Sequence, residues 1–97
     1  MGFRVKVNPT AIADLADIVS YVAAHNPEAA TRLGEALLDA AMSLSDAPLK
    51  GSRYVKFADV RRILLRPYKI FYRVKEAEKV VEILRFWHSS RSEPPIS

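Results

Sequence analysis

Residues 60–91 read VRRILLRPYKIFYRVKEAEKVVEILRFWHSSR and hold most of the strand-forming sequence of this chain. Bulky apolar residues alternate with Arg and Lys along this segment, which is typical of half-buried β-strands. We expect three strands, at residues 60–65, 68–75 and 80–87. Pro67 predicts a turn between the first two, and the polar residues 76–79 predict a hairpin turn between the last two.

The middle strand of the three has two chemically different faces. The first consists of Tyr68, Ile70, Tyr72 and Val74, and the second of Lys69, Phe71, Arg73 and Lys75. Because successive side chains point to opposite sides of a sheet, we expect the first set to face the core and the second to face solvent or a ligand. Residues 80–87 are apolar on both faces apart from Glu82 and Arg85, which predicts a central strand that is partly covered on both sides.

The sequence before this segment predicts one further strand and two helices. Residues 3–7 alternate apolar and basic side chains as a strand does. Asn8 and Pro9 predict the start of a helix, and Asn26 and Pro27 predict the start of a second one, because Asn is a good cap and Pro suits the first helical position. An apolar stripe runs along the first helix through Ala11, Leu15, Ile18 and Val22, and we expect Asp14 and Asp17 to lie off it, towards water.

The second helix carries an alanine-rich face, which allows two helices to approach each other closely. Residues 9–46 therefore predict an antiparallel helical hairpin, which Pro48 ends. The connector at residues 49–59 contains Tyr54 and Phe57 among basic residues. We favour packing of these two rings under the sheet over stacking on nucleic-acid bases.

Together these elements predict an α+β fold in two layers: a strand, an antiparallel helical hairpin, then a three-stranded antiparallel meander. We expect a single domain at residues 1–97, with the hairpin at 9–46, the sheet at 60–88 and a short tail at 89–97. One face of the sheet would stay open and would be lined by the alternating basic residues. Pro94 and Pro95 prevent the tail from continuing the sheet.

Composition excludes several classes of protein. The chain has no cysteine, so a disulfide framework and a thiolate metal site are excluded. Two histidines far apart in sequence predict no metal site, and the three glycines form no phosphate-binding loop, so we expect no cofactor. The sequence has neither an apolar run of membrane-spanning length nor a secretory leader, which favours the cytoplasm and no membrane partner.

Charge is distributed unevenly along the chain. Residues 1–49 carry three Lys or Arg against six Asp or Glu, whereas residues 50–97 carry twelve against five. Such polarity suits an acidic partner of the second half, either a nucleic acid or an acidic protein segment. A charged sheet face that is simply solvated gives the same pattern.

A basic set with one histidine is the main candidate site: Arg61, Arg62, Arg66, Lys69, Arg73, Arg85, His88 and Arg91. Arg and Lys neutralise phosphate charge, and His88 can transfer a proton near neutral pH. The set has the chemistry to cleave RNA without a metal, through attack by the 2′-hydroxyl group. The same residues also fit local hydrogen bonds at a strand end and ion pairs with glutamates.

Six motifs, in this order, resemble the ParE/RelE superfamily of toxins of type II toxin–antitoxin modules, the plasmid-stabilisation type. They are ADLADIVSY at 13–21, NPEAA at 26–30, the Pro48 to Gly51 connector, VRR at 60–62, YKIFYRV at 68–74 and ILRFWHSSR at 83–91. The resemblance covers nearly the whole chain and implies the same fold, together with a cognate antitoxin in a heteromeric complex.

The resemblance implies one of two activities. The ParE-like branch inhibits DNA gyrase without catalysis, whereas the RelE-like branch cleaves mRNA on the ribosome. If the chain is RelE-like, the resemblance implies three catalytic positions: His88, Lys69 and Arg62. In either branch it implies a set of basic contacts to the target or to nucleic acid, which consists of Arg61, Arg62, Lys69, Arg73, Arg85 and Arg91. Residues 92–97 contain no tyrosine, unlike RelE-like nucleases, and the long hairpin looks more like ParE. The sequence therefore favours the ParE-like branch.

Overall fold

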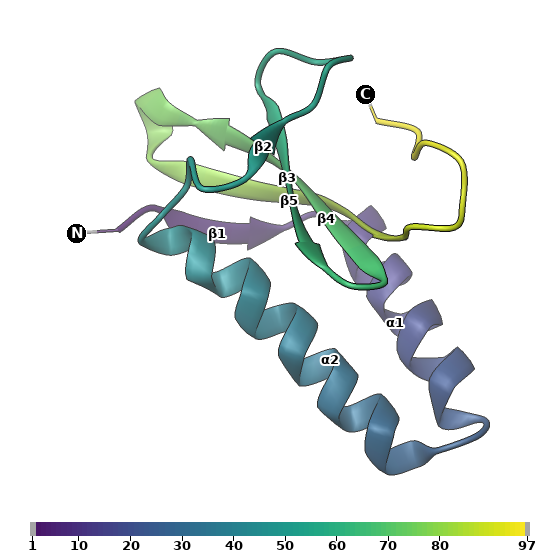
Figure 1. The fold of residues 1–97 in the computed structure, drawn as a ribbon. Helices are drawn as coiled ribbons and strands as arrows, with labels where there is room; N and C mark the ends of the chain where they lie inside the picture. Colours follow the sequence, from purple (N-terminus) through teal and green to yellow (C-terminus); the bar gives the residue numbers. More distant parts are fainter. Residues whose placement is uncertain (1, 97) are drawn as a thin grey trace.

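Two helices pack against one face of a five-stranded sheet in the computed structural model, which describes residues 2–96 (Figure 1). The elements follow the chain as β1 (Arg4–Val7), α1 (Pro9–Ala23), α2 (Pro27–Met42), β2 (Ser52–Arg53), β3 (Val60–Leu65), β4 (Tyr68–Lys75) and β5 (Val80–His88). Short 3-10 turns at Ser43–Ser45 and Glu76–Glu78 follow α2 and β4. This order confirms the predicted α+β architecture.

Both helices begin where the Asn-Pro pairs predict. The Asn8 side chain accepts a hydrogen bond from the backbone N–H of Thr10 at 3.2 Å, and Asn26 accepts one from Ala29 at 3.0 Å. Each cap satisfies a backbone N–H that has no partner within the helix. On the alanine-rich face of α2, Ala30 and Ala41 are almost completely buried, and Ala41 belongs to the core shared with the sheet.

The sheet has the strand order β1-β5-β4-β3-β2. The last three long strands form the predicted antiparallel meander, and β1 pairs with β5 in parallel, so that β5 is central. The two-residue strand β2, which pairs with Arg61 and Arg62 of β3, was not predicted. A strand of two residues is too short to show an alternation of apolar and polar side chains, so the sequence indicates only the turn that precedes it.

A β-bulge in β5 changes which of its residues face the helices. Phe71 of β4 pairs with Arg85, but the next residue, Tyr72, pairs with Ile83, so Leu84 is the extra residue of β5. The bulge shifts the alternation by one position beyond Leu84. Phe86, rather than Arg85, therefore enters the core beside the helices.

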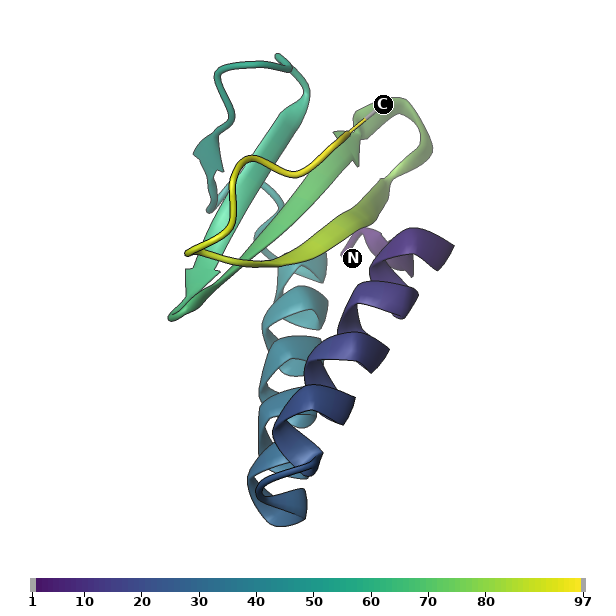
Figure 2. The same ribbon diagram turned by 90° about the vertical axis from the view of Figure 1, so that its right-hand side faces the viewer.

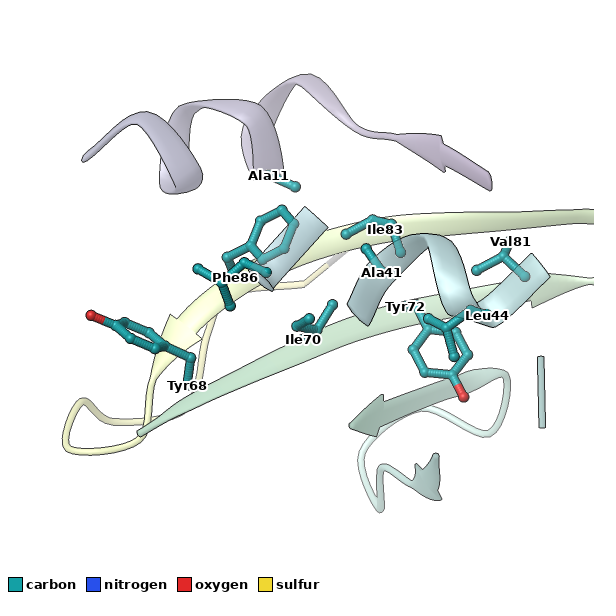
Figure 3. Packing of buried hydrophobic residues seen from close by; sticks show 10 residues of the cluster. Ala11, Ala41, Leu44, Tyr68, Ile70, Tyr72, Val81, Ile83 and Phe86 are labelled. Carbon is teal, nitrogen blue, oxygen red and sulfur yellow. The ribbon is translucent and has the colours of Figure 1, made fainter. Parts of the chain in front are cut away.

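The main core lies between the sheet and the hairpin (Figure 3). Its buried residues are Ala11, Leu37, Ala41, Leu44, Tyr68, Ile70, Tyr72, Val81, Ile83 and Phe86. The predicted inward set of β4 is confirmed, because Tyr68, Ile70 and Tyr72 are buried here and Val74 packs against them. The Tyr72 hydroxyl also accepts a hydrogen bond from the buried N–H of Gly51, at 3.0 Å, which fixes the connector to the sheet.

The opposite face of the sheet carries a second cluster, so the expectation of an open face was wrong. Tyr54, Val60, Phe71, Leu84 and Trp87 are buried together there, with Phe57 and Ile96 packed against them. Packing of Tyr54 and Phe57 under the sheet is thereby confirmed. Figure 2 shows the C-terminal tail, in yellow, passing across this side of the sheet. The connector and the tail shield the large apolar side chains of Phe71 and Trp87 from water on this face.

None of the helices described within residues 2–96 is both long and apolar enough to cross a membrane.

Candidate functional site

The sheet separates the predicted site residues into two groups. In the register of β4 and β5, Tyr68 pairs with His88, and Lys69 pairs with Trp87. Tyr68 belongs to the helix-side core, whereas Trp87 belongs to the cluster on the opposite face. His88 therefore lies on the helix side and Lys69 on the other. Arg62, which pairs with the buried Phe71 of the second cluster, lies on the same face as Lys69.

His88 lines a pocket between α1 and the end of β5. The pocket has a volume of about 290 Å³, and its lining consists of Asp14, Asp17, Ile18, Tyr21, Tyr68, Phe86, His88 and Arg91. The rings of Tyr68 and His88 meet edge to face, with centroids 5.2 Å apart. Nδ1 of His88 accepts a hydrogen bond from the backbone N–H of Ser90 at 3.1 Å, so the neutral ring carries its proton on Nε2.

Arg85 of β5 forms an ion pair with Asp14 of α1. The Arg85 Nε donates to Asp14 Oδ2 at 2.7 Å, and Nη2 donates to Oδ1 at 2.9 Å. The backbone N–H of Phe86 donates to the same carboxylate at 3.2 Å. The hydrogen bonds of Arg85 to the Asp14 carboxylate raise the pKa of Arg85 above its ordinary value.

The expectation that Asp14 faces water was therefore wrong. Its side chain is only 12% exposed, and that of Arg85 only 14%. Asp14 is three residues after the buried Ala11, so it lies at the edge of the apolar stripe, over the bulged strand. The sequence contains this spacing, but it does not contain the bulge that brings Arg85 to the same place. Asp17 is exposed, as expected.

Two more of the predicted basic contacts make bonds within the chain. Arg61 Nη1 donates to the carbonyl oxygens of Leu49, at 3.3 Å, and Gly51, at 2.8 Å, and so holds the connector. Arg73 forms an ion pair with Asp59 at 2.8 Å and lies 3.9 Å from Glu82. Each of these arginines has a structural partner, and a role in contacting a target stays a prediction.

Two arginines lie over the indole ring of Trp87. The guanidinium carbon of Arg85 lies 4.8 Å from the centre of the indole ring, and that of Arg91 lies 3.9 Å from it. Both contacts are within the range of cation–π attraction. The indole N–H donates to the carbonyl oxygen of Ser92 at 2.5 Å. Trp87 thus joins the sheet to the first residues of the tail.

Arg62 and Lys69 share their face with an acidic residue of the tail. The Tyr54 hydroxyl donates a short hydrogen bond to the carboxylate of Glu93. Burial, together with this bond and the negative charge of Glu93, raises the pKa of Tyr54 to about 12. The same bond lowers the pKa of Glu93, and the positive charges of Lys56, Lys69 and Arg62 lower it further. The sequence analysis did not single out Glu93, because an isolated glutamate in a proline-containing tail carries no pattern.

Among residues 2–96, no three His, Asp or Glu side chains come together in a way that would hold a metal ion.

Comparison with known proteins places this geometry in a family. Residues 5–93 match the family model described as the ParE toxin of the type II toxin–antitoxin system, parDE. A comparison with curated protein sequences found no match.

Three similar solved structures have the same fold. The chromosomal ParDE system from P. aeruginosa is 24% identical, with a TM-score of 0.76, and the match covers 89% of this chain and 95% of that one. The RelBE2 toxin–antitoxin complex from Mycobacterium tuberculosis is 25% identical, with a TM-score of 0.71 and coverage of 91% and 99%. The archaeal RelE–RelB complex from Pyrococcus horikoshii OT3 is 21% identical, with a TM-score of 0.65 and coverage of 95% and 100%.

The helical hairpin packed on a small antiparallel sheet is thus the fold of toxins of the ParE and RelE kinds. The match over residues 5–93 shows further that the chain belongs to the ParE toxin family of type II toxin–antitoxin systems.

Proposed function

We propose that this toxin arrests growth as a ParE-like inhibitor of DNA gyrase, which it binds without catalysing a reaction, and that a cognate antitoxin neutralises it. The observation that carries the first part is the separation of His88 from Lys69 and Arg62 by the sheet. A general acid or base must lie within hydrogen-bonding reach of the group whose proton it moves, while the cations hold the same phosphate. The three residues do not converge on one phosphate in this fold.

Two of the other predicted cations support the same conclusion. Arg85 is held by Asp14, and Arg61 is held by backbone carbonyl oxygens. A metal-independent nuclease needs several cations free to follow charge as it develops on the phosphorane. Cations that are already paired within the chain suit a rigid binding surface better than a catalytic site.

The experiment compares two activities of the purified protein. We expect inhibition of DNA supercoiling by gyrase, with an accumulation of double-strand breaks, and intact mRNA when the protein is added to translating ribosomes. Cleavage of mRNA on the ribosome without an effect on gyrase would contradict the proposal and would favour the RelE-like alternative. Absence of growth arrest on expression of the toxin alone would also contradict it and would leave a member that only binds its antitoxin.

The proposed antitoxin follows from the similar structures and from charge. The P. aeruginosa ParDE system and the M. tuberculosis RelBE2 complex are both described as toxin–antitoxin assemblies. The basic half of this chain, residues 50–97, would attract an acidic segment of such a partner. Co-expression with the product of a short adjacent reading frame should yield a heteromeric complex in the cytoplasm and restore growth. Continued arrest with that product bound would contradict the partner's role.

A further inference from the structure

The pocket of about 290 Å³ has one wall from α1 and one from the sheet. The helix supplies side chains at spacings of three, one and three residues, which lie on one helical face: Asp14, Asp17, Ile18 and Tyr21. Tyr68 and Phe86 form the wall on the sheet side. Figure 3 shows the hydroxyl group of Tyr68 pointing away from the other core residues. The pocket therefore combines aromatic and aliphatic walls with carboxylates on the helix.

One of these carboxylates has no partner. Asp14 is bound by Arg85, and the guanidinium of Arg91, which borders the pocket, lies over the ring of Trp87. Asp17 is exposed, and within residues 2–96 no ion pair or hydrogen bond engages its side chain. A free carboxylate beside aromatic rings attracts a cation, because the faces of the rings are electron-rich as well.

Tyr21 forms the rim of the pocket and is accessible to a partner. Its side chain is 76% exposed, and its ring stacks on that of His25, with centroids 6.1 Å apart. Figure 2 shows the helical hairpin projecting beyond the sheet, so a large molecule can reach this part of α1. Tyrosines that present a ring and a hydroxyl group in this way contribute strongly to protein interfaces. The rim therefore suits a protein partner.

The charge of the hairpin favours a basic partner. Residues 9–46 contain six Asp or Glu against one Arg, and all of them except Asp14 are exposed. Opposite potentials attract two proteins to each other and fix the surfaces on which they meet. The acidic segment proposed for the antitoxin suits the basic half of the chain. The hairpin is thus left to a partner of the opposite charge.

We propose that the pocket between α1 and the end of β5 binds an arginine side chain from a basic surface of the toxin's protein target. The inference deepens the target half of the proposed function and rests on it. The aliphatic stem would lie against Ile18, and the guanidinium would lie against the ring of Tyr21 and pair with Asp17. Arginine fits better than lysine, because its planar head stacks on aromatic rings and binds a carboxylate through two hydrogen bonds.

The first test is an amide NMR titration of the full chain with the blocked peptide acetyl-Gly-Arg-Gly-amide. The matched probe carries citrulline in place of arginine, which has nearly the same shape but no charge. We expect the arginine peptide to shift the signals of Asp17, Tyr21 and Tyr68. We also expect it to bind about tenfold more tightly than the citrulline peptide, since the latter loses both the ion pair and the cation–π contact.

Two variants remove these contacts one at a time. D17N removes the free carboxylate and Y21A removes the exposed ring, and both should fold because neither side chain is buried. D39N is the matched control, since it removes an exposed carboxylate from the other helix and changes the net charge equally. We expect D17N and Y21A each to bind the arginine peptide about threefold more weakly than the wild type or D39N.

The second test measures the toxin concentration that half-inhibits supercoiling by gyrase. We expect D17N and Y21A each to need about threefold more toxin than the wild type or D39N. Equal binding of the arginine and citrulline peptides would overturn the proposal, as would equal effects of D17N and D39N on that binding. Full inhibition of gyrase by D17N and Y21A at the wild-type concentration would overturn the assignment of the pocket to the target. If the wild type does not inhibit gyrase, the proposed function fails, whereas the titration tests the pocket without gyrase.

Discussion

Asp14 of α1 and Arg85 of β5 form a two-pronged ion pair across 71 positions of sequence, with donor–acceptor distances of 2.7 and 2.9 Å. The pair lies at the β-bulge, where Asp14 also accepts the backbone N–H of Phe86. It therefore fixes α1 to the central strand at the point where the strand changes its alternation. Both side chains are mostly withdrawn from solvent, so water can replace a lost partner only in part.

Loss of this pair should destabilise the fold. In D14N the guanidinium of Arg85 keeps its charge but loses its anionic partner, and removal of one member of a buried pair costs about 3 kcal/mol. Urea unfolding followed by circular dichroism measures this loss in the free energy of unfolding. D17N is the control on the same helix, and we expect a change of about 0.5 kcal/mol or less because Asp17 is exposed. Equal losses in the free energy of unfolding for D14N and D17N would show that the Asp14–Arg85 pair does not stabilise the fold.

Gly51 should not tolerate a side chain. A Cβ atom there would lie 2.6 Å from the carbonyl oxygen of Arg62 and 2.6 Å from the Tyr72 hydroxyl. Because one of these atoms is backbone, β2 would have to move away from β3, and such overpacking costs about 1–3 kcal/mol. Thermal unfolding of G51A measures this loss of stability, and S52A, which changes the exposed neighbouring residue, is the control. A melting temperature of G51A equal to that of S52A would contradict the close packing.

The tail should detach in acid. The pKa of Glu93 in the folded chain is lowered from its ordinary value of 4.5, so the contribution of its carboxylate is complete above that pH. It is lost as the pH falls through the lowered folded-state pKa. Trp87, the single tryptophan of the chain, donates to Ser92 and should report the release as a change in its fluorescence.

The matched variant for this titration is E93Q, which has no carboxylate to protonate. We expect its fluorescence at neutral pH to resemble that of the wild type in acid, and to change little below pH 4.5. A transition of the same size and midpoint in E93Q would assign the change to another group.

Growth arrest should survive the loss of His88 or of Lys69, two of the three predicted catalytic side chains. H88A and K69A remove groups that lie on opposite faces of the sheet, and a toxin that acts by binding gyrase needs neither for proton transfer. We expect each variant to arrest growth within about tenfold of the wild-type expression threshold. If both variants fold and both lose toxicity completely, the RelE-like reading of these residues gains support.

Local sequence patterns predicted the secondary structure well. The Asn8-Pro9 and Asn26-Pro27 pairs set the helix starts, because cap chemistry involves only residues within one turn. The alternation in β4 predicted which of its side chains are buried on the helix side. These features depend on neighbours in sequence, which is why they can be read without a structure.

The candidate site was harder to predict because the residues that contact one another in it are far apart in the sequence. The basic residues could be identified by residue type, but their partners could not. The structure shows that Asp14 pairs with Arg85, that Asp59 pairs with Arg73, and that the tail covers the sheet face on which Lys69 lies. Nothing in the local sequence of residues 89–97 distinguishes a solvated tail from one that packs across a sheet. The expected open face was wrong for this reason.

The sequence by itself determined the family, the order of the helices and strands, and the basic character of the second half. Only the tertiary structure decided which basic residues share a face, because the extra residue at Leu84 shifts the alternation of β5 and turns Phe86 inward. A shift of one residue reverses the side of every later side chain in a strand. That shift places His88 beside α1, across the sheet from Lys69, and it is why the two residues, which come from neighbouring strands, do not form one site.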